Sequence, residues 1–151
     1  MPELHAAMRW SQAVLAVIKA QSDPKTLNLW ARCAGLSVGA LRARCRASGV
    51  SARDSLCFSR VLRAVVLSKE LTWDPYNLLD VVDDRTLRKL LTKCRLTLER
   101  PPSSVEAFVA MQSFVTNNAN REVLCSLLAE RGYLASHSED GRTFEKRSAV
   151  G

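Results

Sequence analysis

Three arginines stand at alternate positions of one short segment, GLSVGALRARCRASG at residues 35–49. A guanidinium group is a planar, permanently charged donor that binds carboxylates, phosphates and guanine in bidentate geometry. Arg42, Arg44 and Arg46 could therefore bind an anion, if the segment folds so that their side chains reach a surface. Ser37 is a favourable N-cap and a glycine follows the last arginine by three residues, so the segment predicts a short helix.

The faces of this helix, expected at 38–47, follow from a rotation of about 100° per residue. One narrow stripe, predicted to pack inward, consists of Val38, Leu41 and Cys45. The adjacent face, predicted to be exposed, consists of Gly39, Arg42, Ala43 and Arg46. Arg44 points away from this face and is expected to contact a phosphate or an intramolecular carboxylate.

The exposed face is suited to a polyanion. Arg42 and Arg46 are four residues apart, so their charges repel each other unless a negative partner relieves them. Gly39 and Ala43 are small and leave room for a close approach. Such a face is predicted to fit the major groove of DNA, where arginine can be bidentate to guanine O6 and N7. The alternative interpretation is a solvated surface helix.

The elements that must position this helix are also predicted to be helical. Apolar residues follow the helical period almost throughout, so the expected fold class is all-α. Asp23 and Pro24 are expected to begin the helix before the arginines, and Ser51 to cap the one after them. Helices are predicted at 3–21, 24–34, 38–47 and 51 to about Glu70. The second and third flank a very short turn, which is typical of a helix-turn-helix.

A weaker copy follows in DPYNLLDVVDDRTLRKLLTKCRL, offset by 46 residues when Ser37 is aligned with Asp83. A leucine, an arginine and a core residue then recur at the same distances from the cap, which indicates an internal duplication. The copy lacks the turn glycine. Its Asp83 and Asp84 repel phosphate, although both also favour the helix N-terminus.

The segment AGLSVGALRARCRASGVSARDSLCFSRVLRAVVL, residues 34–67, resembles the first half of the AraC/XylS-type DNA-binding domain. In that family a helix-turn-helix is followed by G-x-S-P and a connecting helix with R-[IL]-x-x-A-x-x-L. The matching residues are Gly49, Ser51, Arg60, Val61, Ala64 and Leu67. Ala52 replaces the family's proline, Cys45 its phenylalanine, and VVDD the glycine-phenylalanine turn of the second motif.

The resemblance covers roughly residues 23–98 and implies two helix-turn-helix lobes joined by a long connecting helix. It implies that two recognition helices enter successive segments of the major groove of double-stranded DNA. On the first helix the residues facing the bases would be Val38, Gly39, Arg42 and Ala43, with Arg46 toward the backbone. On the second they would be Asp84, Arg85, Arg88 and Lys89. The first motif is expected to bind DNA, and the second to pack or to contact phosphate.

Outside the recognition helices, the sequence offers mainly structural roles. Arg60 is interpreted as half of a buried ion pair with Asp54 or Glu70. Core anchors are expected at Trp10, Trp30 and Trp73. The five cysteines are interpreted as small buried hydrophobes, because no C-x-x-C pair or metal-site spacing occurs.

The chain divides into segments expected at 1–22, 23–70, 71–100, 101–134 and 135–151. The fourth is an extra helical pair, predicted at 104–115 and 120–132 with Asn120 as N-cap and Gly132 as C-cap. It is expected either to cover the core of the second lobe or to form a dimer or partner surface. The fifth is a polar tail, expected to be mobile.

Charge and composition narrow the classes of function. The net charge is +7, and residues 1–70 hold 11 Lys and Arg against 4 Asp and Glu, which favours a polyanionic partner. No catalytic constellation, cofactor motif, metal site, effector-binding domain or membrane segment is found in the sequence, and a cytoplasmic, non-enzymatic protein is expected.

Two hypotheses of function remain. One is a transcriptional regulator that inserts the helix at 38–47 into DNA. The other is a protein-interaction module on a degenerate helix-turn-helix scaffold. It would use the more acidic second lobe and the helices at 104–131 for a partner or for self-association, and it would be sensitive to Phe108→Asp.

Overall fold

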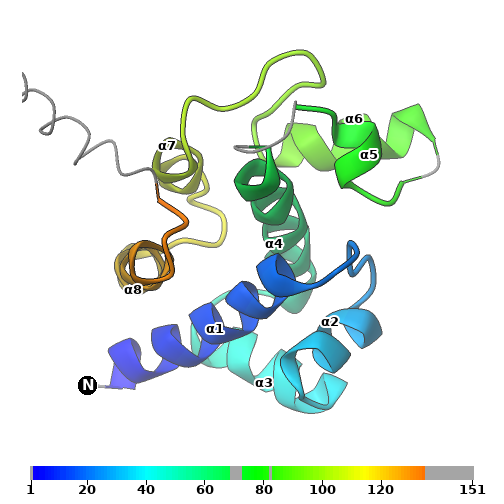
Figure 1. The fold of residues 1–151 in the computed structure, drawn as a ribbon. Coiled ribbons are helices and arrows are strands. Elements are labelled where there is room, and N and C mark those ends of the chain that lie inside the picture. Colours follow the sequence, from blue (N-terminus) through cyan, green and yellow to red (C-terminus); the bar gives the residue numbers. More distant parts are fainter. Residues whose placement is uncertain (1, 69–72, 82, 135–151) are drawn as a thin grey trace, which may run out of the picture.

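The computed structural model describes residues 2–68, 73–81 and 83–134 (Figure 1). Every regular element in these ranges is a helix, which confirms the expected all-α class. The helices are α1 (Pro2–Lys19), α2 (Leu27–Ala34), α3 (Val38–Ala47), α4 (Ala52–Leu67), α5 (Pro75–Leu78), α6 (Asp84–Lys93), α7 (Val105–Ala110) and α8 (Asn118–Glu130). The expected tail at 135–151 and the expected helix end at Glu70 lie outside the described residues.

Helix α4 is the central element (Figure 1). Helices α2 and α3 lie toward one end of it, and α5 and α6 lie near the other. Helix α1 packs against α2, α3 and α4, whereas α8 packs mainly against α1, and α7 against α4. The two segments that carry the predicted recognition helices are therefore separated along α4.

A stack of aromatic rings forms the middle of the core. Trp10, Phe58 and Phe108 are fully buried, and adjacent rings stack with centroids 5.9 Å apart. The Trp10 indole N–H donates to Ser55 Oγ at 2.9 Å, which satisfies its buried polar atom. Because this stack joins α1, α4 and α7, the C-terminal segment is part of the main core.

The other two tryptophans differ in burial. Trp30 is a core anchor as predicted, since it is fully buried and donates to the Ala13 carbonyl at 2.8 Å. Trp73 is only partly buried against the core.

The start of α2 differs from the prediction because Asp23 has another role. Helix α2 begins at Leu27, and its N-cap is Thr26, whose hydroxyl accepts from a backbone N–H. Asp23 is buried and accepts two short hydrogen bonds, from Arg60 Nη2 at 2.6 Å and from the backbone N–H of Asp80 at 2.7 Å. A carboxylate engaged in this way is not available to cap a helix.

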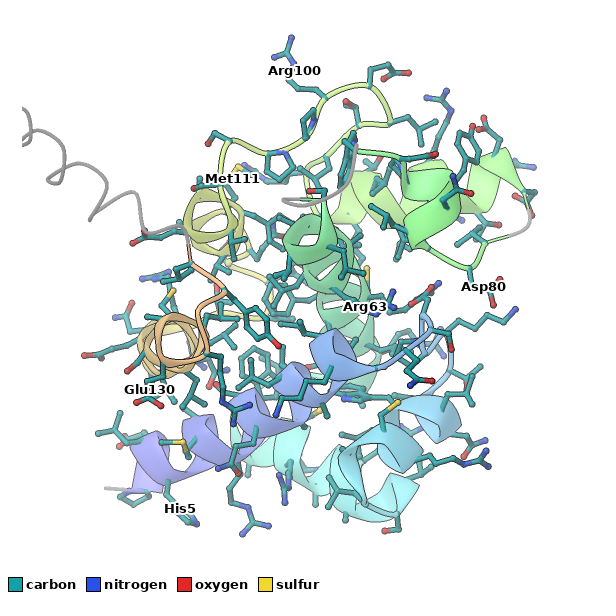
Figure 2. The ribbon with its side chains drawn as sticks, in the orientation of Figure 1. His5, Arg63, Asp80, Arg100, Met111 and Glu130 are labelled. Atoms are coloured by element: carbon teal, nitrogen blue, oxygen red, sulfur yellow. The ribbon has the colours of Figure 1, made fainter. Side chains whose placement is uncertain are left out.

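The predicted ion pair of Arg60 is confirmed, but with Asp23 and not with Asp54 or Glu70 as its partner. Asp54 pairs with Lys93 of α6 at 2.7 Å. A second arginine of α4, Arg63, donates to the carbonyls of Ala20 and Leu78 (Figure 2). Arginines of α4 thus join the segment before α2 to the segment before α6.

The C-terminal pair also departs from its expected bounds. Helix α7 has only 6 residues, and Asn117, not Asn120, is the N-cap of α8. Asn120 is buried and donates to the carbonyls of Ser48 and Val115. Gly132 follows the end of α8 with a φ of 78°, as expected for a glycine stop.

The pair packs mainly against α1 and α4, and the residues after α7 also contact the end of α6, where Gln112 donates to the Cys94 carbonyl at 3.0 Å. Phe108, proposed above as a probe of a partner surface, is fully buried in the aromatic stack. Its replacement by aspartate would bury an unpaired charge and unfold the chain, so it cannot report on a partner.

Candidate nucleic-acid interface

Helix α3 is held by a tight connection to α2. Gly35 ends α2 in the left-handed conformation with a φ of 69°, which explains the glycine at this position. Two residues later, Ser37 Oγ accepts the backbone N–H of Ala40 at 3.0 Å, which confirms the predicted N-cap. The short connection limits how far α3 can turn relative to α2. The side chains that pack beneath α3 then determine which of its faces is exposed.

The predicted inward stripe of α3 is confirmed. Leu41 and Cys45 are 0% and 1% exposed, and Val38 is half-buried against the core. Helix α3 contacts α1, α2 and α4, so this stripe is covered from three sides.

The predicted outward face of α3 is also exposed, in all four of its residues: Gly39, Arg42, Ala43 and Arg46. No carboxylate occurs anywhere in α3. In the described part of the chain, neither guanidinium group of this face forms an ion pair or a hydrogen bond.

The carboxylates closest in sequence are already paired. Asp23 and Asp54 are the only acidic residues between positions 20 and 68, and they bind Arg60 and Lys93. The positive potential at the face of α3 is therefore not neutralised from its own part of the chain.

Arg44 forms no ion pair with a carboxylate of the described residues. It is partly buried, and its Nη1 donates to the backbone carbonyl of Arg9 at 3.0 Å. Burial, and secondly the charge of Arg9, lower the pKa of Arg44. The side chain thus fastens α3 to α1 and adds a cation beside the exposed face, a role that its sequence position did not indicate.

Helix α6 repeats the backbone of α3 with the predicted offset. Asp83 accepts the backbone N–H of Thr86 at 2.7 Å, as Ser37 does for its own helix. Leu87 and Leu91 are 0% and 1% exposed and stand at the same distances from the cap as the two buried residues of α3. Both helices have 10 residues.

The correspondence continues beyond the two helices. The residue after each C-cap has a positive φ, 81° at Gly49 and 64° at Arg95. The next N–H then bonds back to the buried residue, from Val50 to Cys45 at 3.0 Å and from Leu96 to Leu91 at 2.9 Å. Ser51 and Thr97 each accept a backbone N–H three residues later. The same hydrogen bonds therefore recur over 37–54 and 83–100.

The exposed face of α6 differs in charge from that of α3. Arg85, Arg88 and Lys89 are exposed. Arg88 pairs with Asp84 at 2.9 Å and with Glu99 at 3.9 Å. Part of the positive charge of α6 is therefore neutralised within the molecule.

The hydroxyl of Tyr76 in α5 donates to Asp84. This bond, followed by the contact with Arg88, lowers the pKa of Asp84. Nothing in the spacing of the sequence indicated the contact of Tyr76 with Asp84.

The cysteines are less uniformly buried than predicted. Cys45 and Cys94 are buried and Cys57 and Cys125 are half-buried, whereas Cys33 is exposed on α2.

No protein-family model matches the chain, and no curated protein or solved structure matches it either. Among the described residues, no group of His, Cys, Asp and Glu could hold a metal ion. None of the described helices has the length and apolar character needed to cross a membrane.

Proposed function

We propose that this chain is a DNA-binding transcriptional regulator of AraC-like type, with α2 and α3 as a helix-turn-helix that inserts α3 into the major groove. The observation that carries the proposal is the exposed face of α3, where Arg42 and Arg46 have no anionic partner in the described part of the chain. A helix with its side chains is about 10–12 Å wide, which matches a groove about 12 Å wide.

Gly39 supports a role for this face outside the molecule. A glycine inside a helix is less stable than alanine by about 1 kcal/mol. Its φ is not positive, and an added Cβ would meet only Ser37 Oγ at 3.9 Å, so neither the backbone nor the packing requires glycine here. Close approach of an external surface, such as the edges of base pairs, is a sufficient reason for the missing side chain.

The two arginines have different roles in this proposal. Arg42 faces the bases and donates bidentately to guanine, a contact worth about 1–3 kcal/mol of discrimination. Arg46, one turn further along α3, contacts the phosphate backbone. Arg44 is bound to α1 and holds the orientation of α3.

Helix α6 would have the smaller share of the interaction. Arg85 and Lys89 are exposed and available to phosphate, whereas Arg88 is engaged by two carboxylates. Burial of Val105, Phe108 and Val109 of α7, which packs against α4, favours DNA binding over the alternative of a protein-interaction module that uses 104–131.

The test is a fluorescence anisotropy titration of a labelled random-sequence duplex at several salt concentrations. The wild-type chain is expected to bind with log K falling linearly against log salt, by about 0.9 for each phosphate contact. Arg42→Ala/Arg46→Ala is expected to weaken binding at least about 30-fold, which corresponds to about 1 kcal/mol per arginine.

The matched control is Arg100→Ala/Arg131→Ala, which removes the same charge from exposed positions outside α3. Figure 2 shows Arg100 on the side of the molecule opposite to α3. This variant should bind almost as the wild type does. Equal weakening by both variants would mean that only net charge matters, and absence of wild-type binding by a folded chain would refute the proposal.

A further inference from the structure

Two thiols from distant parts of the sequence meet at the junction of α4 and α6. Cys57 lies in α4, and Cys94 is the C-cap of α6. Their Sγ atoms are 4.0 Å apart across 37 residues of sequence. In the described part of the chain, no other two cysteines are in contact. This pairing is a product of the fold, because no spacing rule connects the two positions.

The hydrogen bonds of the two thiols shift their pKa values in opposite directions. Cys57 Sγ lies 3.9 Å from the carbonyl of Leu90, to which its S–H can donate. When that S–H is directed to Leu90, Cys94 is the donor across the pair. The bond from Cys94 lowers the pKa of the Cys57 thiol. The same bond, and burial, raise the pKa of Cys94.

Charged groups from both helices surround Cys57. Lys93 of α6 and Arg60 of α4 favour its thiolate, whereas burial and Asp54 oppose it. Lys93 is also paired with Asp54, and Arg60 with Asp23, so each cation stays close to the thiol. Cys57 is half-buried and can be reached by a small oxidant, whereas Cys94 is fully buried.

We propose that Cys57 and Cys94 are a redox pair, which a hydroperoxide converts into a disulfide between α4 and α6. The Cys57 thiolate attacks one oxygen of hydrogen peroxide, the O–O bond breaks, and sulfenic acid and hydroxide form. The Cys94 sulfur then attacks the Cys57 sulfur, and its proton leaves with the displaced hydroxyl as water. The two sulfurs lose two electrons in total and the peroxide gains them.

Disulfide formation must shorten the distance between the two sulfurs. The sulfurs must approach by about 2 Å to reach the S–S bond length. Cys94 stands at the C-cap, where the chain leaves α6, so rotation of its side chain does not require α6 to unwind. The disulfide would fasten the C-terminus of α6 to α4.

The test begins with the full chain carrying Cys33→Ser/Cys125→Ser, which removes two of the three thiols without a described thiol neighbour and keeps the buried Cys45 as an internal control. The reduced protein is treated with hydrogen peroxide, remaining thiols are blocked with N-ethylmaleimide, and an unreduced digest is analysed by mass spectrometry. The expected product is one peptide pair joined through Cys57 and Cys94, lighter by two hydrogens and separated again by dithiothreitol. Cys45 is buried, so it should carry the maleimide when the oxidised chain is unfolded for the labelling step.

Two variants in the same background assign the steps. Cys57→Ser should abolish the cross-link. Cys94→Ser should stop the reaction at a Cys57 sulfenic acid, which dimedone traps. The cross-link should also lose its specificity for this pair in urea, where the fold no longer holds the thiols together.

Three results would overturn the proposal. One is full maleimide labelling of both Cys57 and Cys94 after peroxide treatment of the folded chain. Another is cross-linking of Cys45 as often as of Cys94. The third is oxidation of Cys57 to sulfinic acid without a cross-link when Cys94 is present.

Discussion

Helices α3 and α6 have the same backbone hydrogen bonds but differ in how far the positive charge of their exposed faces is neutralised. Both are 10 residues long, begin at a capping side chain and bury the residues four and eight positions after that cap. On α3 the exposed arginines have no described partner, whereas on α6 Arg88 is held by Asp84 and Glu99. Equal local structure therefore does not imply an equal exposed surface, because caps and buried residues determine the helix and the exposed residues are independent of both.

The largest expected effect is on stability and concerns the buried ion pair of Asp23 and Arg60, which connects the segment before α2 to α4. Asp23→Ala should lower the free energy of unfolding by about 3–5 kcal/mol, because Arg60, whose side chain is 11% exposed, would lose its only described carboxylate. Urea unfolding followed by tryptophan fluorescence measures the change. The control is Lys25→Ala, which breaks an exposed pair with Asp80 and should change stability by less than about 1 kcal/mol. Similar losses for both variants would show that the buried pair is not the main connection.

The next largest effect is expected on DNA binding, where variants of the exposed faces of α3 and α6 can be compared. Arg85→Ala/Lys89→Ala should weaken DNA binding only several-fold and reduce the salt slope by about 0.9 for each lost phosphate contact. The α3 double variant described above should weaken binding at least about 30-fold. Anisotropy titrations of both variants on one duplex make the comparison. Equal losses would mean that α6 reads DNA as α3 does.

A smaller effect on stability is expected at the position after each C-cap, where the first repeat has a glycine and the second an arginine. Gly49→Ala should destabilise the chain by about 1 kcal/mol, because its φ of 81° suits glycine. Arg95→Gly should stabilise it by up to about 1 kcal/mol, because Arg95 adopts a φ of 64° in the equivalent position. Thermal unfolding of both variants measures the two shifts. Shifts in the same direction would contradict the structural equivalence of these positions.

The smallest expected effect is on the first turn of α6, whose stability depends on pH through its cap, Asp83. The backbone N–H of Thr86 holds the pKa of the Asp83 carboxyl below its usual value of 3.8. A carboxyl with a lowered pKa stabilises the fold above its unfolded pKa, and this contribution disappears as the pH falls through the folded pKa. Acid should therefore loosen the first turn of α6 and leave α3 unchanged, because Ser37 does not titrate.

Backbone chemical shifts between about pH 5 and pH 2 follow both helix starts. Asp83→Ser, which copies the cap of α3, should reduce the acid sensitivity of α6 and leave the part that is due to Asp84, whose pKa is also lowered. Equal loosening of α3 and α6 in acid would show that the effect is global and not a property of this cap.

Local signals account for the elements that could be predicted. Ser37 and Ser51 cap the helices that they were expected to cap, and Gly35 and Gly132 end theirs, because these roles depend on neighbouring backbone groups. Asp23 and Asn120 carry the same capping signal and do not cap. Both are buried and bind groups more than 50 residues away in the sequence, which no local rule contains.

For the candidate site, the sequence by itself determined the inward stripe and the outward arginines of α3, because the helical period assigns each residue to a face. Only the tertiary structure decided which cations are free. Arg44 is bound to the carbonyl of Arg9 and Arg88 is paired with Asp84 and Glu99, while Arg42 and Arg46 have no described partner. It also decided that Cys57 meets Cys94. Periodicity assigns a residue to a face, whereas the packing of distant segments determines what that face meets.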